Sequence, residues 1–278
     1  MEQFTTVEGL KAGLASRRGS SVGFVPTMGA LHEGHVSLVK RARAENDTVV
    51  VSVFVNPTQF NDKEDLRNYP RTPEADLEVL RAAGADVVFM PSVEEVYPEP
   101  DMRVFDSGML EKVMEGASRP GHFNGVAQVV SRLFEFVEPD RAYFGEKDFQ
   151  QIAVIKALVK QLGLNLAIVE CPIVREADGL ALSSRNRLLT PRHRAAAPAI
   201  HTALQEGAAQ AGRRSVADVC GAVTARIEAE PLLKVIYFKL VDEDTLAEVS
   251  DWNGTGHVRG CVAVQAGDIR LIDNMRFL

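Results

Sequence analysis

The sequence predicts an α/β protein in which a doubly wound parallel sheet is followed by a smaller α+β domain. Two observations support this prediction. Over residues 1–174, short apolar runs alternate with helical stretches of about 10 to 15 residues, which is typical of βαβ units and a parallel sheet. After residue 174 the alternation stops, and two helical stretches are followed by two or three apolar runs. The length of 278 residues is enough for two modest domains.

Each strand of the first domain is predicted from a short apolar run bounded by turn residues. The runs cover residues 22–25, 48–55, 86–90, 141–144 and 166–171. Pro26 is expected to end the first strand. The run at 48–55 is almost continuously apolar, which is typical of a parallel strand covered on both faces.

The helices of the first domain are predicted from amphipathic spacing and from the residues at their ends. Pro73 suits the first turn of a helix that Gly84 ends, and Asp148 can cap another helix. The predicted helices cover 36–46, 73–83, 125–137 and 148–162.

The second domain lacks the βαβ pattern. Its predicted helices cover 191–211 and 215–228, and its predicted strands cover 235–241, 258–265 and 269–272. The domain assignment is therefore a Rossmann-like domain over 1–174 and a smaller α+β domain over 175–278.

Composition and charge exclude several classes of protein. With 31 Lys and Arg against 38 Asp and Glu, the chain has a net charge of −7, which argues against a nucleic-acid partner. No apolar run approaches the ~18 residues of a membrane helix, and the first ten residues are polar, so we expect no membrane partner and a cytoplasmic location. The three cysteines form no CxxC pair. The glycine-rich fingerprints of dinucleotide and P-loop enzymes are absent.

The stretch from Val25 to His35 is the most informative part of the chain. It follows the first predicted strand and opens a helix, which places it at the carboxyl edge of the sheet, where open α/β folds bind ligands. A helix N-terminus suits phosphate, and His32 and His35, three residues apart, can face the same side. Zinc sites of the HExxH type need histidines four residues apart, so no metal site is expected. Two solvated histidines are the simpler alternative for the pair alone.

Three further motifs carry polar groups suited to binding. Lys147 lies at another strand end and helix start, and Ser183 to Asn186 lie in a stretch with five arginines against Glu176 and Asp178. Asn56 and Gln59 are uncharged hydrogen-bonding residues that suit hydroxyl and carboxyl groups. A loop at 119–123 is a candidate for further contacts, although packing or capping is the favoured interpretation of its His122. Each motif alone is also compatible with a solvated turn.

Together, five ordered motifs resemble the pantothenate synthetase (pantoate–β-alanine ligase) family, within the nucleotidyltransferase superfamily with HIGH- and KMSKS-like signatures. The HIGH-like element is His32-Glu33-Gly34-His35, and the KMSKS-like element is Leu182-Ser183-Ser184-Arg185, with leucine where the family usually has methionine. The resemblance covers about residues 22–189. The motifs are FVPTMGALHEGH, VSVFVNPTQF, YPRTPEADL, FGEKDFQQ and VREADGLALSSRN.

The resemblance implies an enzyme that makes an amide in two steps. Pantoate attacks the α-phosphorus of ATP to give pantoyl adenylate and pyrophosphate, and the amine of β-alanine then displaces AMP to give pantothenate, a coenzyme A precursor. It further implies Mg²⁺ carried on the ATP phosphates, no dedicated metal ligands and a homodimer. The first domain would bind nucleotide and pantoate, and the second would carry the serine–arginine loop at its start.

The resemblance also implies the site residues. The catalytic groups would be His32, His35, Lys147 and Arg185, with His35 as the acid toward the leaving group. The residues implied to bind ATP are Met28, Gly29, Ala30, Leu31, His32, Glu33, Gly34, His35, Gly145, Glu146, Lys147, Asp148, Val174, Leu182, Ser183, Ser184 and Arg185. Those implied to bind pantoate or β-alanine are Pro26, Met28, Asn56, Gln59, Phe60 and Gln151.

Three alternatives predict different behaviour. Another nucleotidyltransferase of the superfamily would act on a phosphate-bearing acceptor and should show a basic pocket in place of Asn56 and Gln59. An RNA-binding relative of the class I aminoacyl-tRNA synthetases would need a basic second domain, yet residues 175–278 carry equal numbers of basic and acidic groups. An ATP-sensing module would bind ATP and form no AMP.

Overall fold

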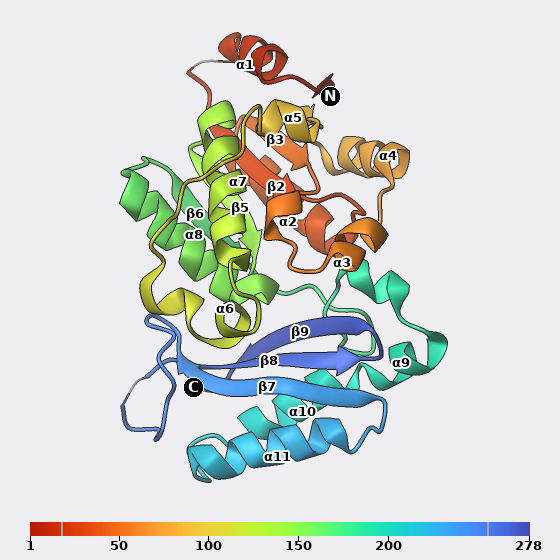
Figure 1. The fold of residues 1–278 in the computed structure, drawn as a ribbon, viewed down its shortest axis with the longest axis vertical. Helices are drawn as coiled ribbons and strands as arrows, with labels where there is room; N and C mark the ends of the chain where they lie inside the picture. Colours follow the sequence, from red (N-terminus) through yellow and green to blue (C-terminus); the bar gives the residue numbers. More distant parts are fainter. Residues whose placement is uncertain (18, 255) are drawn as a thin grey trace. The chain divides into compact units, whose positions relative to one another are not determined.

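The computed structural model describes residues 1–17, 19–254 and 256–278. It divides into two compact units, Met1–Pro172 and Ile173–Leu278 (Figure 1). The first unit contains the parallel sheet and the second a small antiparallel one, so the predicted fold class is confirmed. None of the helices in the described part of the chain combines the length and apolarity that a membrane crossing requires.

The sheet of the first unit is parallel throughout, and its described strands follow the order β1-β4-β3-β2-β5-β6. From β2 the chain moves one way to β3 and β4, and then returns to the other side of β2 for β5 and β6, as a doubly wound sheet requires. The bounds are β1 (Glu2–Phe4), β2 (Val22–Thr27), β3 (Thr48–Val53), β4 (Val87–Phe89), β5 (Arg141–Gly145) and β6 (Ala167–Cys171).

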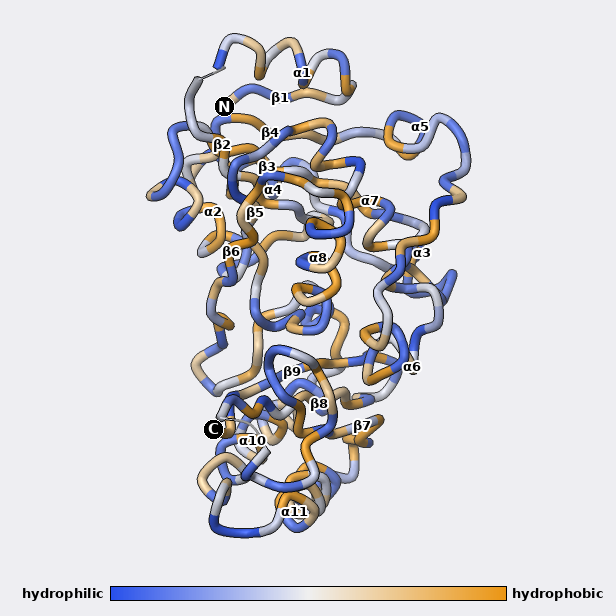
Figure 2. Tube along the Cα trace, turned by 90° about the vertical axis from the view of Figure 1, so that its left-hand side faces the viewer, coloured by the Kyte–Doolittle hydropathy of each residue, from blue (hydrophilic) through white to orange (hydrophobic). Residues whose placement is uncertain are grey.

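Helices cover both faces of this sheet because neighbouring strand residues point to opposite sides. Phe24 packs in the core that contains α1, α7 and α8, whereas Val25 packs in the core that contains α2 and α4. Figure 2 shows the apolar residues along the strands between them. The helices are α1 (Val7–Ala15), α2 (Glu33–Glu45), α3 (Lys63–Asn68), α4 (Pro73–Ala83), α5 (Val93–Val96), α6 (Met114–Ser118), α7 (His122–Val137) and α8 (Phe149–Leu162), with 3₁₀ turns η1 (Pro57–Gln59), η2 (Gly108–Glu111) and η3 (Glu146–Asp148).

Several predicted boundaries were wrong for identifiable reasons. Strand β2 continues through Pro26, because its pairing with β5 has already ended at Phe24 and a missing N–H is tolerated there. Helix α2 begins at Glu33, three residues early, because the two histidines cap it. Asp148 occupies the N-cap position of α8, but its carboxylate contacts Lys147 and makes no capping hydrogen bond.

The N-terminal strand and helix were not predicted. Strand β1 has three residues and pairs only at one edge, with β4, so it leaves little apolar pattern in the sequence. The short helices α3, α5 and α6 were not predicted either, because a helix of six residues or fewer also leaves little apolar pattern in the sequence.

The second unit packs helices α10 and α11 on the antiparallel sheet β7-β8-β9 around one core. The helix predicted over 191–211 is two helices, because Pro198 removes a backbone donor between them. The bounds are η4 (Ser184–Leu188), α9 (Pro191–Ala196), α10 (Ala199–Ala208), α11 (Val216–Glu228), β7 (Leu233–Asp242), β8 (Val258–Ala266) and β9 (Ile269–Arg276).

Candidate active site

The candidate site lies where the neighbouring strands β3, β2 and β5 end. Strands β2 and β5 pair only at Gly23–Arg141 and Phe24–Ala142, although both continue for three more residues. They therefore separate toward their carboxyl ends at the point where the strand order reverses. Such a switch point is the usual ligand-binding position of an open α/β sheet. The motifs that follow β2, β3 and β5 are those predicted to bind the substrates.

A buried carboxylate fixes the loop that follows β2. Asp76, on α4 and 2% exposed, accepts hydrogen bonds from the N–H groups of Ala30 and Leu31 at 2.9 and 2.8 Å. The hydroxyl of Thr72 donates to the same carboxylate at 3.1 Å. The N–H groups of these two loop residues therefore face Asp76. Any contact of Ala30 and Leu31 with a nucleotide has to use other atoms.

Gly29 makes this close approach possible. Its φ is +81°, and a Cβ there would lie 2.9 Å from Asp76 Oδ2 and 3.0 Å from Val53 Cγ1. The following residue, Ala30, also has a positive φ of 50°. A side chain at position 29 would both strain the backbone and push the carboxylate away. The loop conformation thus depends on a glycine next to a buried acid.

The two histidines cap helix α2 and each other. Gly34 N donates to His32 Nδ1 at 3.1 Å, and His32 N donates to His35 Nδ1 at 3.3 Å. The ring centroids are 4.1 Å apart, which confirms that the rings share one side of the turn. Because both Nδ1 atoms accept hydrogen bonds, the hydrogen of each neutral ring lies on Nε2. Glu33 and Gly34 occupy the first turn, with Glu33 exposed to solvent.

Lys147 brings a cation to the end of β5. It lies in η3 between Glu146 and Asp148, and its Nζ is 3.2 Å from Asp148 Oδ1. Gly145 ends the strand, and Gln151 lies half-buried in the first turn of α8. Among the described residues, no group of three or more His, Cys, Asp or Glu side chains has the arrangement of a metal site.

Gln59 follows β3 in η1 and lies against the loop after β2. Its Nε2 donates to Met28 Sδ at 3.2 Å, and its Oε1 accepts from Asn56 Nδ2 at 3.1 Å. Phe60 comes next and packs against Tyr69, with ring centroids 5.7 Å apart. Gln59 and Met28, both predicted to bind the acceptor, are thus brought into contact, and Pro26 lies two residues before Met28 at the end of β2.

Asn56 is more deeply buried than a residue predicted to contact the acceptor directly. It is 1% exposed, and protein groups engage both ends of its amide. The predicted direct contact of Asn56 with the acceptor is not supported by this burial. Its contact with the substrate side is through Gln59.

His122 holds the backbone of Gln59, as expected for a packing histidine. Its Nδ1 donates to the carbonyl of Gln59 at 2.8 Å, and Arg119 donates to its Nε2 at 3.2 Å and to the same carbonyl at 3.3 Å. Burial, and then the charge of Arg119, lowers the pKa of His122 to about 4. Gly125 lets α7 approach, since a Cβ there would lie 2.4 Å from the carbonyl oxygen of Thr58.

In the second unit, the serine–arginine loop is built on a short hairpin. Leu182 N donates to the carbonyl of Val174 at 3.0 Å, which brings these two predicted ATP-binding residues together. Ser183 caps η4 through Arg185 N, and Ser184 is buried.

The basic excess predicted near this loop is partly neutralised. Arg175 forms a bidentate pair with Asp273, and Arg194 pairs with both Glu176 and Asp178. These two arginines therefore support the hairpin.

The supporting roles of Asp76 and Tyr97 were missed from sequence, and Arg119 was placed in a loop suited to further contacts without a partner being predicted for it. A signal for Asp76 exists, because it lies on the same face of α4 as Leu80 and Ala83, four and seven residues on. A carboxylate on the apolar face of a helix needs partners, and here those partners are the loop N–H groups. For Arg119 and Tyr97, nothing local in the sequence indicates that their partners are Gln59 and Asn56.

Comparisons with known proteins cover the whole chain. A family model described as pantoate-beta-alanine ligase matches residues 2–276. A pantothenate synthetase of Porphyromonas gingivalis strain W83 is 58% identical over 279 residues, covering 100% of this chain and 99% of the relative. One from Bacteroides fragilis strain ATCC 25285 is 54% identical with the same coverage.

Solved structures agree. A pantothenate synthetase of Thermus thermophilus superposes with a TM-score of 0.95 at 48% identity, covering 100% of this chain and 99% of that one. A pantoate-beta-alanine ligase of Francisella tularensis, solved as a complex with Beta-gamma ATP and β-alanine, has a TM-score of 0.85 at 36% identity, covering 100% and 98%.

Proposed function

The chain belongs to the pantoate-β-alanine ligase family, and on this premise we propose that it condenses (R)-pantoate with β-alanine to pantothenate, with ATP converted to AMP and pyrophosphate. It is a ligase that forms an amide bond. Its product is a precursor of coenzyme A. A phosphate-bearing acceptor is not favoured, because the group after β3 that lies against Met28 is the uncharged amide of Gln59.

One observation supports the proposal most directly. The ends of β2, β5 and β3 carry, in that order, a histidine-capped helix start, a lysine and a glutamine amide. The first two are suited to phosphate and the third to a carboxylate or hydroxyl. Because the three strands are neighbours in a parallel sheet, a nucleotide and an acid are expected to meet at this edge.

In the first step, an oxygen of the pantoate carboxylate attacks the α-phosphorus of ATP and forms the new P–O bond. The bond from the α-phosphorus to the bridging oxygen breaks, and pyrophosphate leaves with that electron pair. We assign the Nε2–H groups of His32 and His35 as donors to the departing phosphates, with His35 as the acid, and Lys147 as the neutralising cation. The hydrogen bonds to both Nδ1 atoms are compatible with this role, because they leave Nε2 as the position for the hydrogen of a neutral ring.

In the second step, the β-alanine amine attacks the acyl carbon of pantoyl adenylate. The new C–N bond forms, the acyl C–O bond breaks, and AMP leaves with the electron pair while the amine loses a proton. Gln59 and Gln151 are assigned to bind the hydroxyl and carboxylate groups of pantoate. Its apolar contacts are assigned to Pro26, Met28 and Phe60. Positioning accounts for this step, and no covalent enzyme intermediate is needed.

The remaining assignments rest on the motifs and on the loop chemistry of each unit. Nucleotide contacts are assigned to Met28, Gly29, Gly145, Asp148 and Val174, and phosphate contacts to Ser183, Ser184 and Arg185. Mg²⁺ is proposed to accompany the triphosphate, and it is given no protein ligand set because the described residues form no such cluster. A homodimer and a cytoplasmic location complete the proposal.

Isotope exchange tests the proposed reaction. Protein incubated with ATP and labelled pyrophosphate should incorporate label into ATP only when pantoate is present, and addition of β-alanine should then yield AMP and pantothenate. Exchange without pantoate, or with a phosphate-bearing acceptor in its place, would overturn the proposal. ATP binding with no AMP formed would favour a sensing role, and tight, salt-sensitive tRNA binding would favour an RNA-binding one.

A further inference from the structure

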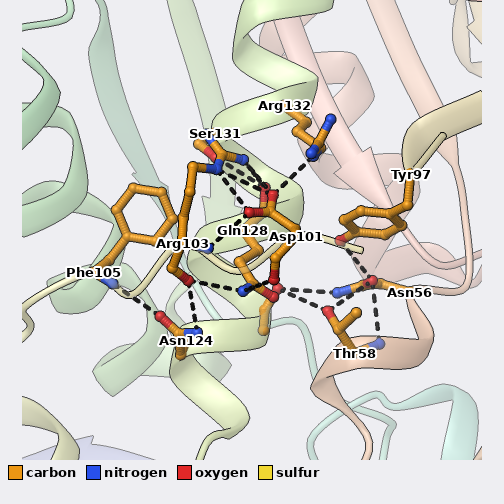
Figure 3. A network of polar contacts seen from close by, with 11 residues as sticks. Asn56, Thr58, Tyr97, Asp101, Arg103, Phe105, Asn124, Gln128, Ser131 and Arg132 are labelled. Carbon is orange, nitrogen blue, oxygen red and sulfur yellow. Dashed lines mark hydrogen bonds and ion pairs between the residues drawn. The ribbon is translucent and has the colours of Figure 1, made fainter. Parts of the chain in front are cut away.

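A network of polar contacts brings Tyr97 to Asn56 and Thr58, the residues that precede Gln59 (Figure 3). Tyr97 directly follows α5, and its hydroxyl donates to Asn56 Oδ1 at 2.9 Å. Burial raises the pKa of Tyr97, so the hydroxyl remains a donor at neutral pH. Its ring packs against Phe54, with centroids 6.4 Å apart.

A charged group also contacts the Tyr97 ring. The guanidinium of Arg132 lies 5.2 Å from the ring centroid, and Arg132 is itself held by Asp101 at 2.8 Å. Asp101 is also bound by Arg103, and these contacts hold the pKa of its carboxyl well below the usual range. The carboxylate of Asp101 therefore stays ionised, and it keeps Arg132 in place beside the Tyr97 ring.

The partners of Asn56 leave its amide one orientation. Its Oδ1 accepts from Tyr97, from Thr58 N and from Thr58 Oγ1. Its Nδ2 donates to the carbonyl of Gly125 at 3.0 Å and to Gln59 Oε1 at 3.1 Å. A rotated amide would set its NH₂ against the N–H of Thr58 and its oxygen against the carbonyl of Gly125, in a site that is 1% exposed.

This orientation is passed on to Gln59. Because Gln59 Oε1 accepts from Asn56, its Nε2 occupies the opposite end of the amide, beside Met28 Sδ. The carbonyl of Gln59 is held separately by His122 and Arg119, so the backbone does not set the side-chain amide. The amide of Gln59 thus offers N–H, rather than C=O, on the side of the residues assigned to the acid substrate.

We propose that Tyr97 is a positioning residue that acts through Asn56 to orient the Gln59 amide, so that Nε2–H meets an acceptor oxygen of the pantoate carboxylate or hydroxyl. The inference rests on the proposed function and extends it to acceptor selectivity. Tyr97 touches no reacting atom. Its effect belongs to the recognition of one substrate and leaves ATP recognition unchanged.

Steady-state kinetics of Tyr97→Phe test the relay. The variant keeps the ring and its contacts with Phe54 and Arg132, and it loses only the donor to Asn56. We expect the KM for pantoate to rise about 3- to 10-fold, the size of one hydrogen bond, while the KM for ATP changes less than twofold. Asn56→Asp, which removes the donor to Gln59, should raise the pantoate KM further.

Tyr143→Phe is the matched control. The hydroxyl of Tyr143 also contacts a buried asparagine, Asn46, at 2.7 Å, but Asn46 precedes β3 at the opposite edge of the sheet. This control should share any loss of melting temperature and leave both KM values unchanged. Equal rises of the two KM values in Tyr97→Phe, or no rise for pantoate, would overturn the relay. Absence of pantoate-dependent exchange in the unmodified protein would instead overturn the proposed function.

Discussion

The two units support their proposed ATP-binding loops by different means. In the first unit, the loop after β2 is held by Asp76, which is 2% exposed and accepts two backbone N–H groups. In the second unit, the hairpin before Ser183 has two supports: Arg175 pairs with the buried Asp273, and Arg194, whose side chain is 29% exposed, pairs with Glu176 and Asp178. Asp76 is therefore buried, whereas the pairs of Arg194 are partly open to water.

This difference predicts unequal consequences. A buried acceptor that is removed leaves its donors unpaired away from water, at a cost of about 1–3 kcal/mol. A partly exposed ion pair is replaced by water and contributes about 0–1 kcal/mol. Loss of Asp76 should therefore cost the first loop more than loss of Arg194 costs the hairpin of the second unit.

The largest effect should come from removing the cation that the first unit supplies. Lys147→Ala should lower the rate of pantoate-dependent adenylation on the order of 10²-fold or more, the usual scale for one preorganised group that stabilises developing charge. Pyrophosphate exchange measures it. Lys147→Arg is the control, because it keeps the charge at this strand end and should retain more activity than the alanine variant. Near-normal exchange in Lys147→Ala would remove it from the phosphate site.

Lowering the pH should destabilise the first unit, because His122 is buried there in its neutral form. The pKa of His122 is lowered by burial to about 4 from 6.5. The unfolded chain therefore takes up a proton near pH 6.5 while the folded protein does not until about pH 4. As the pH is lowered from about 6.5 to 4, the free energy of unfolding should fall by up to about 3 kcal/mol because of this histidine. Above about pH 6.5 the histidine should cause no such change.

Denaturant titrations of the wild type and His122→Gln at several pH values measure this contribution. The variant keeps a neutral donor near the Gln59 carbonyl, so the difference between the two curves isolates the histidine. We expect the wild type to lose more stability than the variant between about pH 6.5 and 4. If the free energies of unfolding of the two proteins changed with pH in parallel, the pKa of His122 would not be lowered in the folded protein.

Comparison of sequence and structure shows where local patterns are sufficient. The βαβ alternation predicted the parallel sheet, and the helix at 73–83 was predicted to the residue, because a proline and a left-handed glycine mark its ends. Pro26 and Pro198 were misjudged in opposite directions. The effect of a proline depends on whether a neighbouring strand or turn needs its missing N–H, and that is a property of the tertiary structure.

The same division applies to the candidate site. His32, Lys147 and Gln59 were predictable because each follows a strand in a recognisable motif. Their supports were not, since Asp76 lies 45 residues from Leu31, and Tyr97 lies 41 residues from Asn56. In the second unit, Glu176 and Arg194 lie 18 residues apart around their loop, whereas Arg175 and Asp273 lie 98 residues apart. Local sequence therefore reveals the groups assigned to the substrates more readily than the buried groups that hold them.

Asp76→Asn tests the buried support directly. The substitution replaces one acceptor oxygen by an NH₂ group that faces the N–H of Ala30 or Leu31. We expect the free energy of unfolding to fall by about 2 kcal/mol and adenylation to slow as the loop loosens. The control is Asp47→Asn, since Asp47 also accepts from a backbone N–H, of Ser21, but is exposed. If both variants lose equal stability, burial is not what distinguishes the loop.

The smallest effect should come from Arg194→Ala in the second unit. The hydrogen bond from Arg194 lowers the pKa of Asp178, but the side chains of Glu176 and Asp178 are 30 and 42% exposed, so water can replace the guanidinium. We expect a loss of no more than about 1 kcal/mol in the free energy of unfolding, smaller still in high salt, and a change of adenylation below a few-fold. Arg226→Ala, which breaks an exposed pair between α11 and Glu206, provides the baseline for such a loss. A salt-independent loss in Arg194→Ala as large as that of Asp76→Asn would mean that the pairs of Arg194 are not replaced by water and act like the buried contacts of Asp76.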